Sequence, residues 1–325
     1  MMSLLTGLLW LSCLPVAILV LMLIVELLLA LRSLRPLPMA ERLPVAILMP
    51  AHNESAVLSA TLAKLRPQLL STDRLLVVAD NCSDNTAQLA IDAGAEVLER
   101  FDDDQRGKGF ALAAGMAHLA DDPREVVIIV DADCDVAEGG VAQLSAATAA
   151  VNKPVQALYL MHPPRGGELS GLIATFAFIV RNHVRPRGGA ALGSPVHLMG
   201  TGMAFPWSVL SQASLATGNI VEDMKLGVDL SLQHQGALFC ETARVMSQFP
   251  DDQEATTSQR TRWEHGHLQT IGVEVPRLLS AAWRQRSTSL LLSALDLAIP
   301  PLTLLLVASA AFNLLALVWA FLSGS

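Results

Sequence analysis

Short apolar runs alternate with segments of helical pattern through the middle of the chain. The helical segments begin near Ser55, near Ser83 and after Gly109. Runs rich in Val, Ile and Leu suit buried strands, and the segments between them have the longer period of a helix. This alternation predicts an α/β domain with a mostly parallel sheet and helices on both faces. The strand-like runs are VAILMP (45–50), RLLVVAD (74–80), AEVLER (95–100), VVIIVDAD (126–133) and VQALYLM (155–161).

Two longer apolar runs lie near the ends of the chain, at residues 4–32 and 302–322. Each is long enough to cross a hydrocarbon core of about 30 Å as a helix. No basic residue precedes the first run, and the run is longer than the apolar core of a signal peptide. We therefore predict a membrane anchor at each end, consistent with a chain in which 52% of the residues are hydrophobic.

Arginines flank both predicted spans on the side of the α/β region, and they set the predicted orientation. By the positive-inside rule, the region between the spans is cytoplasmic and both termini lie outside. We therefore expect an integral protein of a bacterial inner membrane. The arginines are Arg32, Arg35 and Arg42 after the first span, and Arg277, Arg284 and Arg286 before the second.

The segment STSLLLSALDLAIPP (287–301) is too short to cross the bilayer and contains Asp296. We predict that it lies in the membrane surface, with a hairpin that partly re-enters the bilayer as the alternative. Glu26, near the cytoplasmic end of the first span, is predicted to reach the interface. The predicted domains are a transmembrane helix (1–35), the α/β domain (44–265), interfacial helices (266–300) and a second transmembrane helix (301–325).

Cysteine spacing and charge exclude several classes of protein. The four cysteines form no CxxC pair, which argues against a disulfide or zinc framework. The formal net charge is −8 and no basic run exists, so no nucleic-acid partner is expected.

Three polar clusters follow strand-like runs: PAHNE, ADNCSDNT and DADCD. Ligands of open parallel sheets gather outside the carboxyl ends of the strands, so a pocket is predicted there. Asp131 and Asp133 can both turn toward a hard cation, and oxygen ligands select Mg²⁺ or Mn²⁺. The ligands are too few for an all-protein cage, so a phosphorylated substrate is expected to share the metal. A solvated acidic turn is the alternative, and Asp135 is interpreted as a turn residue.

The segment RGKGFAL (106–112) reads as the start of a helix at which Lys108 offers a positive charge to an anion. Gly107 and Gly109 let the backbone approach a ligand. The segment lacks the spacing of a P-loop, and no G-x-G-x-x-G follows the first strand. Hydride chemistry is therefore disfavoured.

Two further clusters carry candidate chemistry. In GNIVEDMKLG (218–227), Glu222 and Asp223 are either the acidic first turn of a helix or a catalytic base. In SQRTRWEHGH (258–267), Arg260 and Arg262 either face the membrane surface or clamp a diphosphate. The H-x-H formed by His265 and His267 has no third ligand, so we interpret both histidines as polar support rather than a metal site.

In the order PAHNE, ADNCSD, GKG, DAD, GTG, ED and QRTRW, the chain resembles a membrane-bound family 2 glycosyltransferase of the cellulose synthase, hyaluronan synthase and ceramide glucosyltransferase type. The resemblance runs from about Val45 to Trp263. It implies a GT-A fold, a Rossmann-like cytoplasmic domain flanked here by transmembrane and interfacial helices. It also implies an inverting mechanism and a nucleotide-sugar donor.

The resemblance implies roles for the matching positions. Asp223 matches the general base, and Asp131 and Asp133 match the pair that holds Mg²⁺ or Mn²⁺. The acceptor loop GTG often contains a Cys in the family, and here it does not. Implied acceptor residues are Gly200, Thr201, Gly202, Glu222 and Trp263. Implied residues for the nucleotide sugar are Pro50, Ala51, His52, Asn53, Glu54, Asp80, Lys108, Asp131, Ala132, Asp133, Gln259, Arg262 and Trp263.

The expected function is transfer of one sugar to a lipid, lipid-linked or polysaccharide acceptor at the cytoplasmic membrane face, with membrane lipids around the anchors. A processive synthase is the alternative. It needs a channel, which two predicted spans supply only in a homo-oligomer or with a partner. A non-catalytic assembly subunit is the alternative of another class, and the motifs disfavour it because such a subunit has no need for Asp223.

Overall fold

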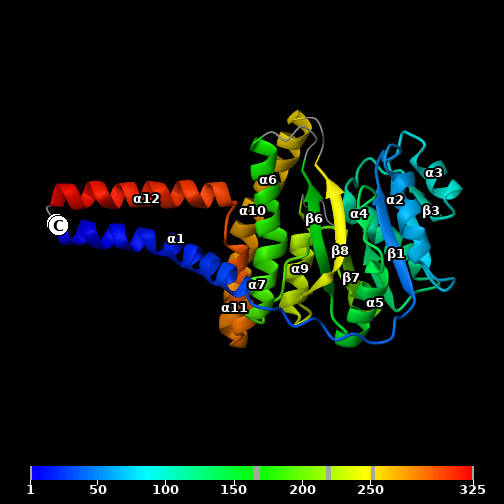
Figure 1. The fold of residues 1–325 in the computed structure, drawn as a ribbon, viewed down its shortest axis with the longest axis horizontal. Coiled ribbons are helices and arrows are strands. Elements are labelled where there is room, and N and C mark those ends of the chain that lie inside the picture. The colour runs from blue at the N-terminus through cyan, green and yellow to red at the C-terminus, as the bar shows by residue number, and fades with distance from the viewer. Residues whose placement is uncertain (1, 164–168, 217–220, 250–252, 324–325) are drawn as a thin grey trace.

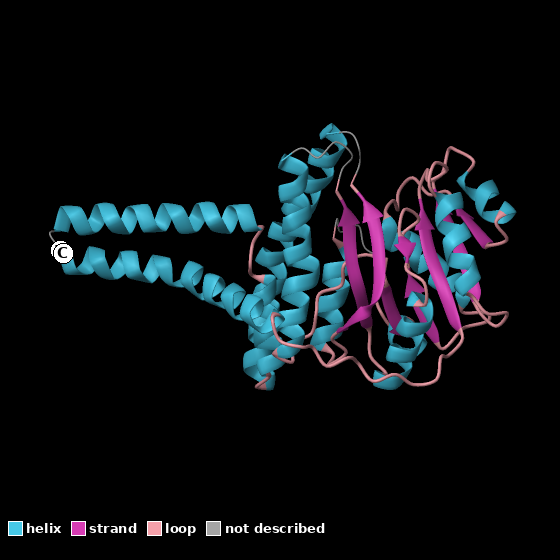
Figure 2. Ribbon diagram, viewed as in Figure 1, coloured by secondary structure: helices cyan, strands magenta, loops and turns pink. Residues whose placement is uncertain are grey.

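The computed structural model describes residues 2–163, 169–216, 221–249 and 253–323. Two long helices project from one side of an α/β domain (Figures 1 and 2). The strands are β1 Val45–Ala51, β2 Arg74–Asp80, β3 Glu96–Arg100, β4 Val126–Ile129, β5 Asp135–Val136, β6 Val155–His162, β7 Met203–Pro206 and β8 Leu238–Gln248. The helices are α1 Met2–Ala30, α2 Leu58–Leu65, α3 Thr86–Asp92, α4 Lys108–Leu119, α5 Gly140–Val151, α6 Leu169–Ile179, α7 Arg185–Ala191, α8 Trp207–Leu210, α9 Glu222–Leu232, α10 Gln253–Gln285, α11 Thr288–Leu297 and α12 Leu302–Ser323. A 3₁₀ turn covers Arg66–Gln68 (η1), and a π-helical turn covers Val180–Val184 (η2).

The strands form one sheet in the order β3-β2-β1-β4-β7-β6-β8-β5. β3, β2, β1 and β4 are parallel to their neighbours, and β6 is parallel to β8. β7 is antiparallel to both β4 and β6, and β5 is antiparallel to β8. The predicted α/β fold with a mostly parallel sheet is confirmed.

Alternation along β1 divides the core between the two faces of the sheet, as the period of a strand requires. Val45, Ile47 and Met49 pack with residues of α2 and α5. Ala46 and Leu48 pack on the opposite face with residues of α4 and α9. β1 is buried over most of its length because helices cover both faces.

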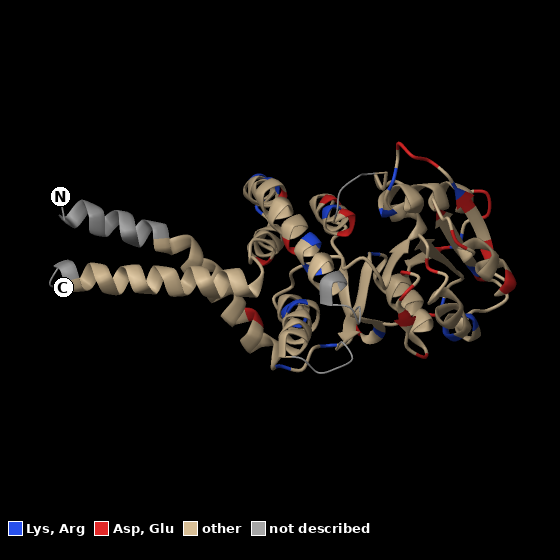
Figure 3. Cartoon of the chain, turned by 90° about the horizontal axis from the view of Figure 1, so that it is seen from above, with Lys and Arg blue, Asp and Glu red and all other residues tan. Residues whose placement is uncertain are grey.

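The segments Cys13–Ala30 of α1 and Leu302–Phe321 of α12 are long and apolar enough to cross a membrane. Only 11% and 6% of these windows is buried inside the protein, so neither is a core helix. The two helices project side by side, and the described part of α12 carries no charged residue (Figures 1 and 3). Between them and the sheet stand α6, α10 and α11 (Figure 1).

Glu26 of α1 does not reach the interface, contrary to the sequence prediction. It is fully buried, and its carboxylate lies 3.2 Å from Arg185 Nε on α7. Arg185 also pairs with Asp296 of α11, and Asp296 lies 3.1 Å from His197 Nε2. Gly188 makes this packing feasible, because a Cβ there would meet the backbone of α1 at 2.2 Å. A buried charge network therefore joins the first candidate span to the α/β domain.

α10 is continuous from Gln253 to Gln285. It crosses residue 266, where the sequence divides the α/β domain from the interfacial helices. The C-terminal part of α10, with Leu278 and Ala281, packs on α9 and on α11, and α11 contributes Leu290 to this cluster. Trp283, predicted to lie at the membrane surface, is 87% exposed.

Candidate functional site

Polar side chains converge at the carboxyl ends of β1, β2 and β4, the edge at which the sequence predicts a pocket. These three strands are parallel neighbours, so the loops that follow them lie side by side. Asp131 and Asp133 follow β4. Two helix N-termini face the same edge, because Lys108 is the first residue of α4 and Asp223 is the second of α9.

Lys108 is the centre of this cluster. Its Nζ lies 2.5 Å from Asp131 Oδ1 and donates a 2.8 Å hydrogen bond to the carbonyl oxygen of Gly200. Burial by itself lowers the pKa of Lys108, but Asp131, with Glu222 and Asp223 farther away, raises that pKa above its usual value. Lys108 is therefore a permanent positive charge beside the carboxylates.

The loop at Gly200 brings the backbone against the cluster. Gly200 has φ +85°, a conformation that favours glycine. A Cβ at this position would lie 3.4 Å from both Asp223 Oδ2 and Lys108 Nζ. Thr201, predicted to face an acceptor, is fully buried, and its hydroxyl accepts a 3.1 Å hydrogen bond from the Asp131 N–H. A Cβ on Gly202 would lie within 3 Å of core side chains, so only Gly200 of this loop faces the carboxylates.

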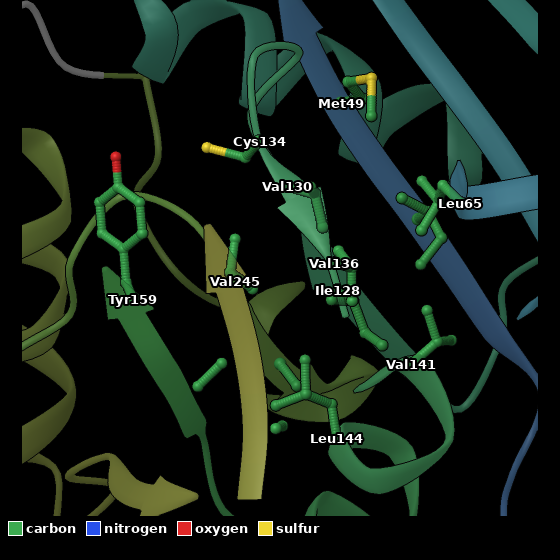
Figure 4. Close-up of a cluster of buried hydrophobic side chains, with 14 of the residues drawn as sticks. Met49, Leu65, Ile128, Val130, Cys134, Val136, Val141, Leu144, Tyr159 and Val245 are labelled. Carbon is green, nitrogen blue, oxygen red and sulfur yellow. The ribbon is translucent and has the colours of Figure 1, made fainter. Parts of the chain in front are cut away.

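Asp131 and Asp133 have the geometry to hold a cation together. Their carboxylate oxygens and Cys134 Sγ lie within 4.8 Å of one another. Burial raises the pKa of the Cys134 thiol well above its usual value, and the thiol donates to Asp133 at 3.3 Å. Cys134 also points into the apolar cluster rather than outward (Figure 4), so it stays a protonated thiol. The two carboxylates remain, and they fit a hard cation such as Mg²⁺ or Mn²⁺.

Neighbouring side chains set the environment of the two carboxylates. Burial raises the pKa of Asp131, and Lys108 opposes that rise. The Ser247 hydroxyl on β8 donates to Asp133 Oδ2 at 3.1 Å, a contact that sequence reasoning missed. Asp135 is not a turn residue as predicted. It begins β5, and its carboxylate lies 2.5 Å from Lys64 on the protein surface.

The loop after β1 is bonded to the loop after β2. His52 Nδ1 lies 2.7 Å from the carbonyl oxygen of Asp80, and Asn53 Oδ1 accepts a 2.8 Å hydrogen bond from the Ser83 N–H. The Glu54 N–H donates to Thr86 Oγ1 at 2.9 Å. Burial, and then the charges of Asp133 and Asp131, raises the pKa of Glu54. The loop after β1 is thus fixed close to the Asp131 and Asp133 carboxylates. Pro50, implied as a nucleotide contact, lies near the end of β1, just before this loop.

Asp80 has a partner that the sequence analysis did not identify. Its buried carboxylate lies 2.7 Å from Nη1 of Arg100, at the end of β3. Arg100 also pairs with Asp102 at 3.0 Å. Arg100 is the last residue of a strand parallel to β2, and this position at the same sheet edge was a usable signal. Ala132, implied as a nucleotide contact, is 2% exposed with its methyl in the core, so only its backbone can serve a ligand.

The acidic pair begins α9, as the sequence predicts, and residues 218–220 before it lie outside the described residues. Burial raises the pKa of Asp223, while Lys108 opposes the rise. Burial and then the charge of Asp223 raises the pKa of Glu222 to about 7. Asp223 is therefore more basic than an ordinary carboxylate, as a proton acceptor requires.

The QRTRW segment lies within α10. The Trp263 ring lies 6.2 Å from that of Phe178, which also contacts Tyr159 at 5.2 Å and so reaches the cluster around Cys134. Arg262 is exposed, and none of the ion pairs among the described residues includes it. Among the residues that the structure describes, no hydrogen-bond donor reaches the buried Oε1 atom of Gln259.

The two histidines of α10 behave differently. His265 is exposed. His267 is buried, its Nε2 lies 3.2 Å from the carbonyl oxygen of Leu297, and burial lowers its pKa to about 3. His267 is thus a neutral side chain that packs against α11.

A family model described as "Glycosyltransferase like family 2" matches residues 42–266. No curated protein matches the chain significantly. Among solved structures, the chain is similar to the mannosyltransferase PcManGT from Pyrobaculum calidifontis in complex with GDP-Man and Mn²⁺, with a TM-score of 0.58 and 16% identity over 97% of this chain and 90% of that chain. It is also similar to glucosyl-3-phosphoglycerate synthase from Mycobacterium tuberculosis in complex with Mn²⁺, UDP and phosphoglyceric acid, with a TM-score of 0.42 and 24% identity over 61% and 68% of the two chains. The first similarity shows a shared fold, and the predicted GT-A architecture is confirmed.

Proposed function

Because the chain belongs to glycosyltransferase family 2, we propose that it transfers a sugar from a nucleoside diphosphate to an acceptor hydroxyl, with inversion at the anomeric carbon. The acceptor is a lipid, a lipid-linked glycan or a polysaccharide at the cytoplasmic face of the membrane. The observation that carries the proposal is the convergence of Lys108, Asp131 and Asp223 around Gly200. This cluster combines a cation, a metal-binding carboxylate and a carboxylate of raised pKa.

The donor occupies the edge of the sheet from β2 to β4. The first loop and Asp80 bind the nucleoside, where Arg100 holds the Asp80 carboxylate in place. Asp131 and Asp133 would hold Mg²⁺ or Mn²⁺, which would supply charge stabilisation at the diphosphate. The mannosyltransferase with the same fold is in complex with GDP-Man and Mn²⁺, which supports the same class of donor and metal. Arg262 is exposed and available to contact the diphosphate.

Asp223 accepts the proton from the acceptor hydroxyl as its oxygen attacks the anomeric carbon. The bond from that carbon to the diphosphate breaks, and the nucleoside diphosphate leaves with the bonding electrons. Lys108 keeps a positive charge beside Asp131 and Asp223, so the carboxylates can stay ionised at the sheet edge despite their burial. Trp263 and the Gly200 backbone bound the acceptor side of this cluster.

A processive synthase remains the second candidate within the same chemistry. It requires a channel, and the described residues contain two helices able to span a membrane. A channel would therefore need an oligomer or a partner. A non-catalytic assembly subunit is disfavoured because it would have no use for a half-buried Asp223 beside Lys108 and Gly200.

Replacement of Asp223 tests the proposal. Asp223→Asn should lower turnover by about 10²- to 10⁴-fold, because an amide of similar size cannot accept the proton. Affinity for a nucleoside diphosphate should change little. Asp229→Asn is the control, since Asp229 lies on the same helix but pairs with Lys225 and Arg277. Purified protein and a panel of radiolabelled nucleotide sugars give the turnover, and normal turnover in Asp223→Asn would refute the assignment.

The orientation of the chain belongs to the same proposal. The arginines beside the spans support a cytoplasmic α/β domain with both termini outside. A cysteine tag at the C-terminus should react with an impermeant maleimide in intact cells. Labelling only after the inner membrane is opened would reverse the proposed orientation of α12.

A further inference from the structure

A largely apolar cavity of about 110 Å³ lies between α6, α10 and the start of α12. Its apolar wall includes Ile173, Ala177, Phe178 and Trp263. Apolar cavities of about 150 Å³ bind a molecule the size of benzene, so this one can hold a short segment of a hydrocarbon chain. The cavity is separate from the Asp131 and Asp133 carboxylates, but it shares Trp263 with the acceptor side proposed above.

Arg181 places a positive charge in the wall of this cavity. It lies on the π-helical turn η2, an irregularity that is frequent at functional sites. Its guanidinium donates to Met224 Sδ at 3.5 Å, and Met224 follows the proposed base in sequence. Arg185, on the next helical turn, pairs with two carboxylates, whereas none of the ion pairs among the described residues includes Arg181. Arg181 is half-buried and outside any close ion pair in that part of the chain, and the carboxylate whose charge acts on it most strongly is Asp223. A guanidinium in this setting can bind an anion beside Asp223.

Part of the cavity wall lies where the membrane is expected. Pro300, Pro301 and Leu302 line it, and the candidate span begins at Leu302. The outer face of α6 is apolar and exposed beside it, with Leu169 at 73% and Phe176 at 65% exposure. The residues that line the cavity therefore include both the start of the candidate span and Arg181, whose guanidinium contacts Met224 of α9.

We propose that this cavity binds the acceptor, and that the acceptor is an anionic amphiphile with an apolar chain and a head that carries both a hydroxyl and an anionic group such as a phosphate. The chain lies against α6 and Trp263, and the anionic group binds Arg181. The head hydroxyl then faces Asp223, because Met224 contacts Arg181. The inference rests on the proposed function and deepens it, since it names the class of acceptor.

The test uses full-length protein in phosphatidylcholine nanodiscs and measures binding of radiolabelled octyl phosphate, octanol and inorganic phosphate. The wild type should bind octyl phosphate at least 10-fold more tightly than either other probe. Arg181→Gln should lose about 10-fold in affinity for octyl phosphate and keep its affinity for octanol. Ala177→Trp, which fills the cavity, should weaken both amphiphiles.

Two matched controls lie outside the cavity. Arg284→Gln removes an exposed arginine of α10, and Leu172→Trp adds an indole to the exposed side of α6. Both should bind octyl phosphate like the wild type. If Arg284→Gln loses as much affinity for octyl phosphate as Arg181→Gln, surface charge alone attracts the probe. If inorganic phosphate binds as tightly as octyl phosphate, the site binds an anion but no hydrocarbon chain. Either result overturns the inference.

Binding of a nucleoside diphosphate with Mn²⁺, measured on the same samples, separates the two proposals. If the wild type and every variant bind the nucleotide but octyl phosphate binds no better than octanol, the acceptor inference fails and the proposed function stands. If the wild type binds no nucleotide, the proposed function fails. Nucleotide binding by Arg181→Gln also shows that this variant is folded.

Discussion

Gly200→Ala isolates the effect of one methyl group inside the carboxylate cluster. The new Cβ would lie 3.4 Å from Asp223 Oδ2, 3.4 Å from Lys108 Nζ and 3.9 Å from Asp131 Oδ2. These are contact distances, so the cluster itself needs little rearrangement. An acceptor oxygen, however, must approach the base to about 2.6–3.2 Å, and the methyl would occupy space at its carboxylate.

Gly193 provides a matched control for the backbone strain. Gly200 has φ +85° and Gly193 has φ +75°, so alanine costs roughly 1–2 kcal/mol at either position. A Cβ on Gly193 meets no atom within 4 Å. Both variants should therefore lose the same few degrees of melting temperature. A misplacement of about 1 Å at a reacting group can cost about 10²-fold, so Gly200→Ala should turn over about 10²-fold more slowly than Gly193→Ala.

The assay is sugar transfer by the two purified variants, with nucleoside diphosphate affinity and melting temperature measured in parallel. Affinity for the nucleotide should be equal in both. Equal turnover would show that the acceptor does not approach Asp223 past Gly200. A much lower melting temperature for Gly200→Ala alone would trace its inactivity to folding instead.

Three further predictions concern other parts of the chain. Asp133→Asn should abolish Mn²⁺ binding by calorimetry and transfer activity, and full wild-type activity in chelator would refute the metal assignment. Arg185→Met should lower the free energy of unfolding by about 3–5 kcal/mol, because Glu26 and Asp296 would stay buried without their cation. The double variant Arg185→Met with Glu26→Gln should recover part of that loss in thermal unfolding. The pKa of Glu222 is raised to about 7, against an ordinary 4.5, so its protonated form contributes stability that is full below about pH 4.5 and lost as pH rises through 7. In metal-free protein, Glu222→Gln should therefore flatten the fall of melting temperature between pH 5 and 8. Identical pH profiles in the two proteins would contradict this prediction.

Local patterns in the sequence predict the sheet and the edge at which the site lies. Strand alternation is a property of neighbouring residues. The runs at 45–50 and 74–80 appear as β1 and β2, and the first half of the run at 126–133 appears as β4. Parallel neighbours place their carboxyl ends together, so Asp80 and Asp131 follow to the same edge. The order of the short motifs was enough to identify the family.

Only the tertiary structure decided which groups become partners. Glu26 and Arg185 are 159 residues apart, and nothing local to an apolar helix indicates that its one carboxylate is buried against a distant arginine. The same holds for Ser247 at Asp133 and for Arg181 beside Met224, because these contacts depend on how helices and strands pack. Sequence pattern therefore determined the elements and the chemistry at their ends. Packing across long separations decided the charge balance, the buried network and the apolar cavity, since burial and distance exist only in the folded chain.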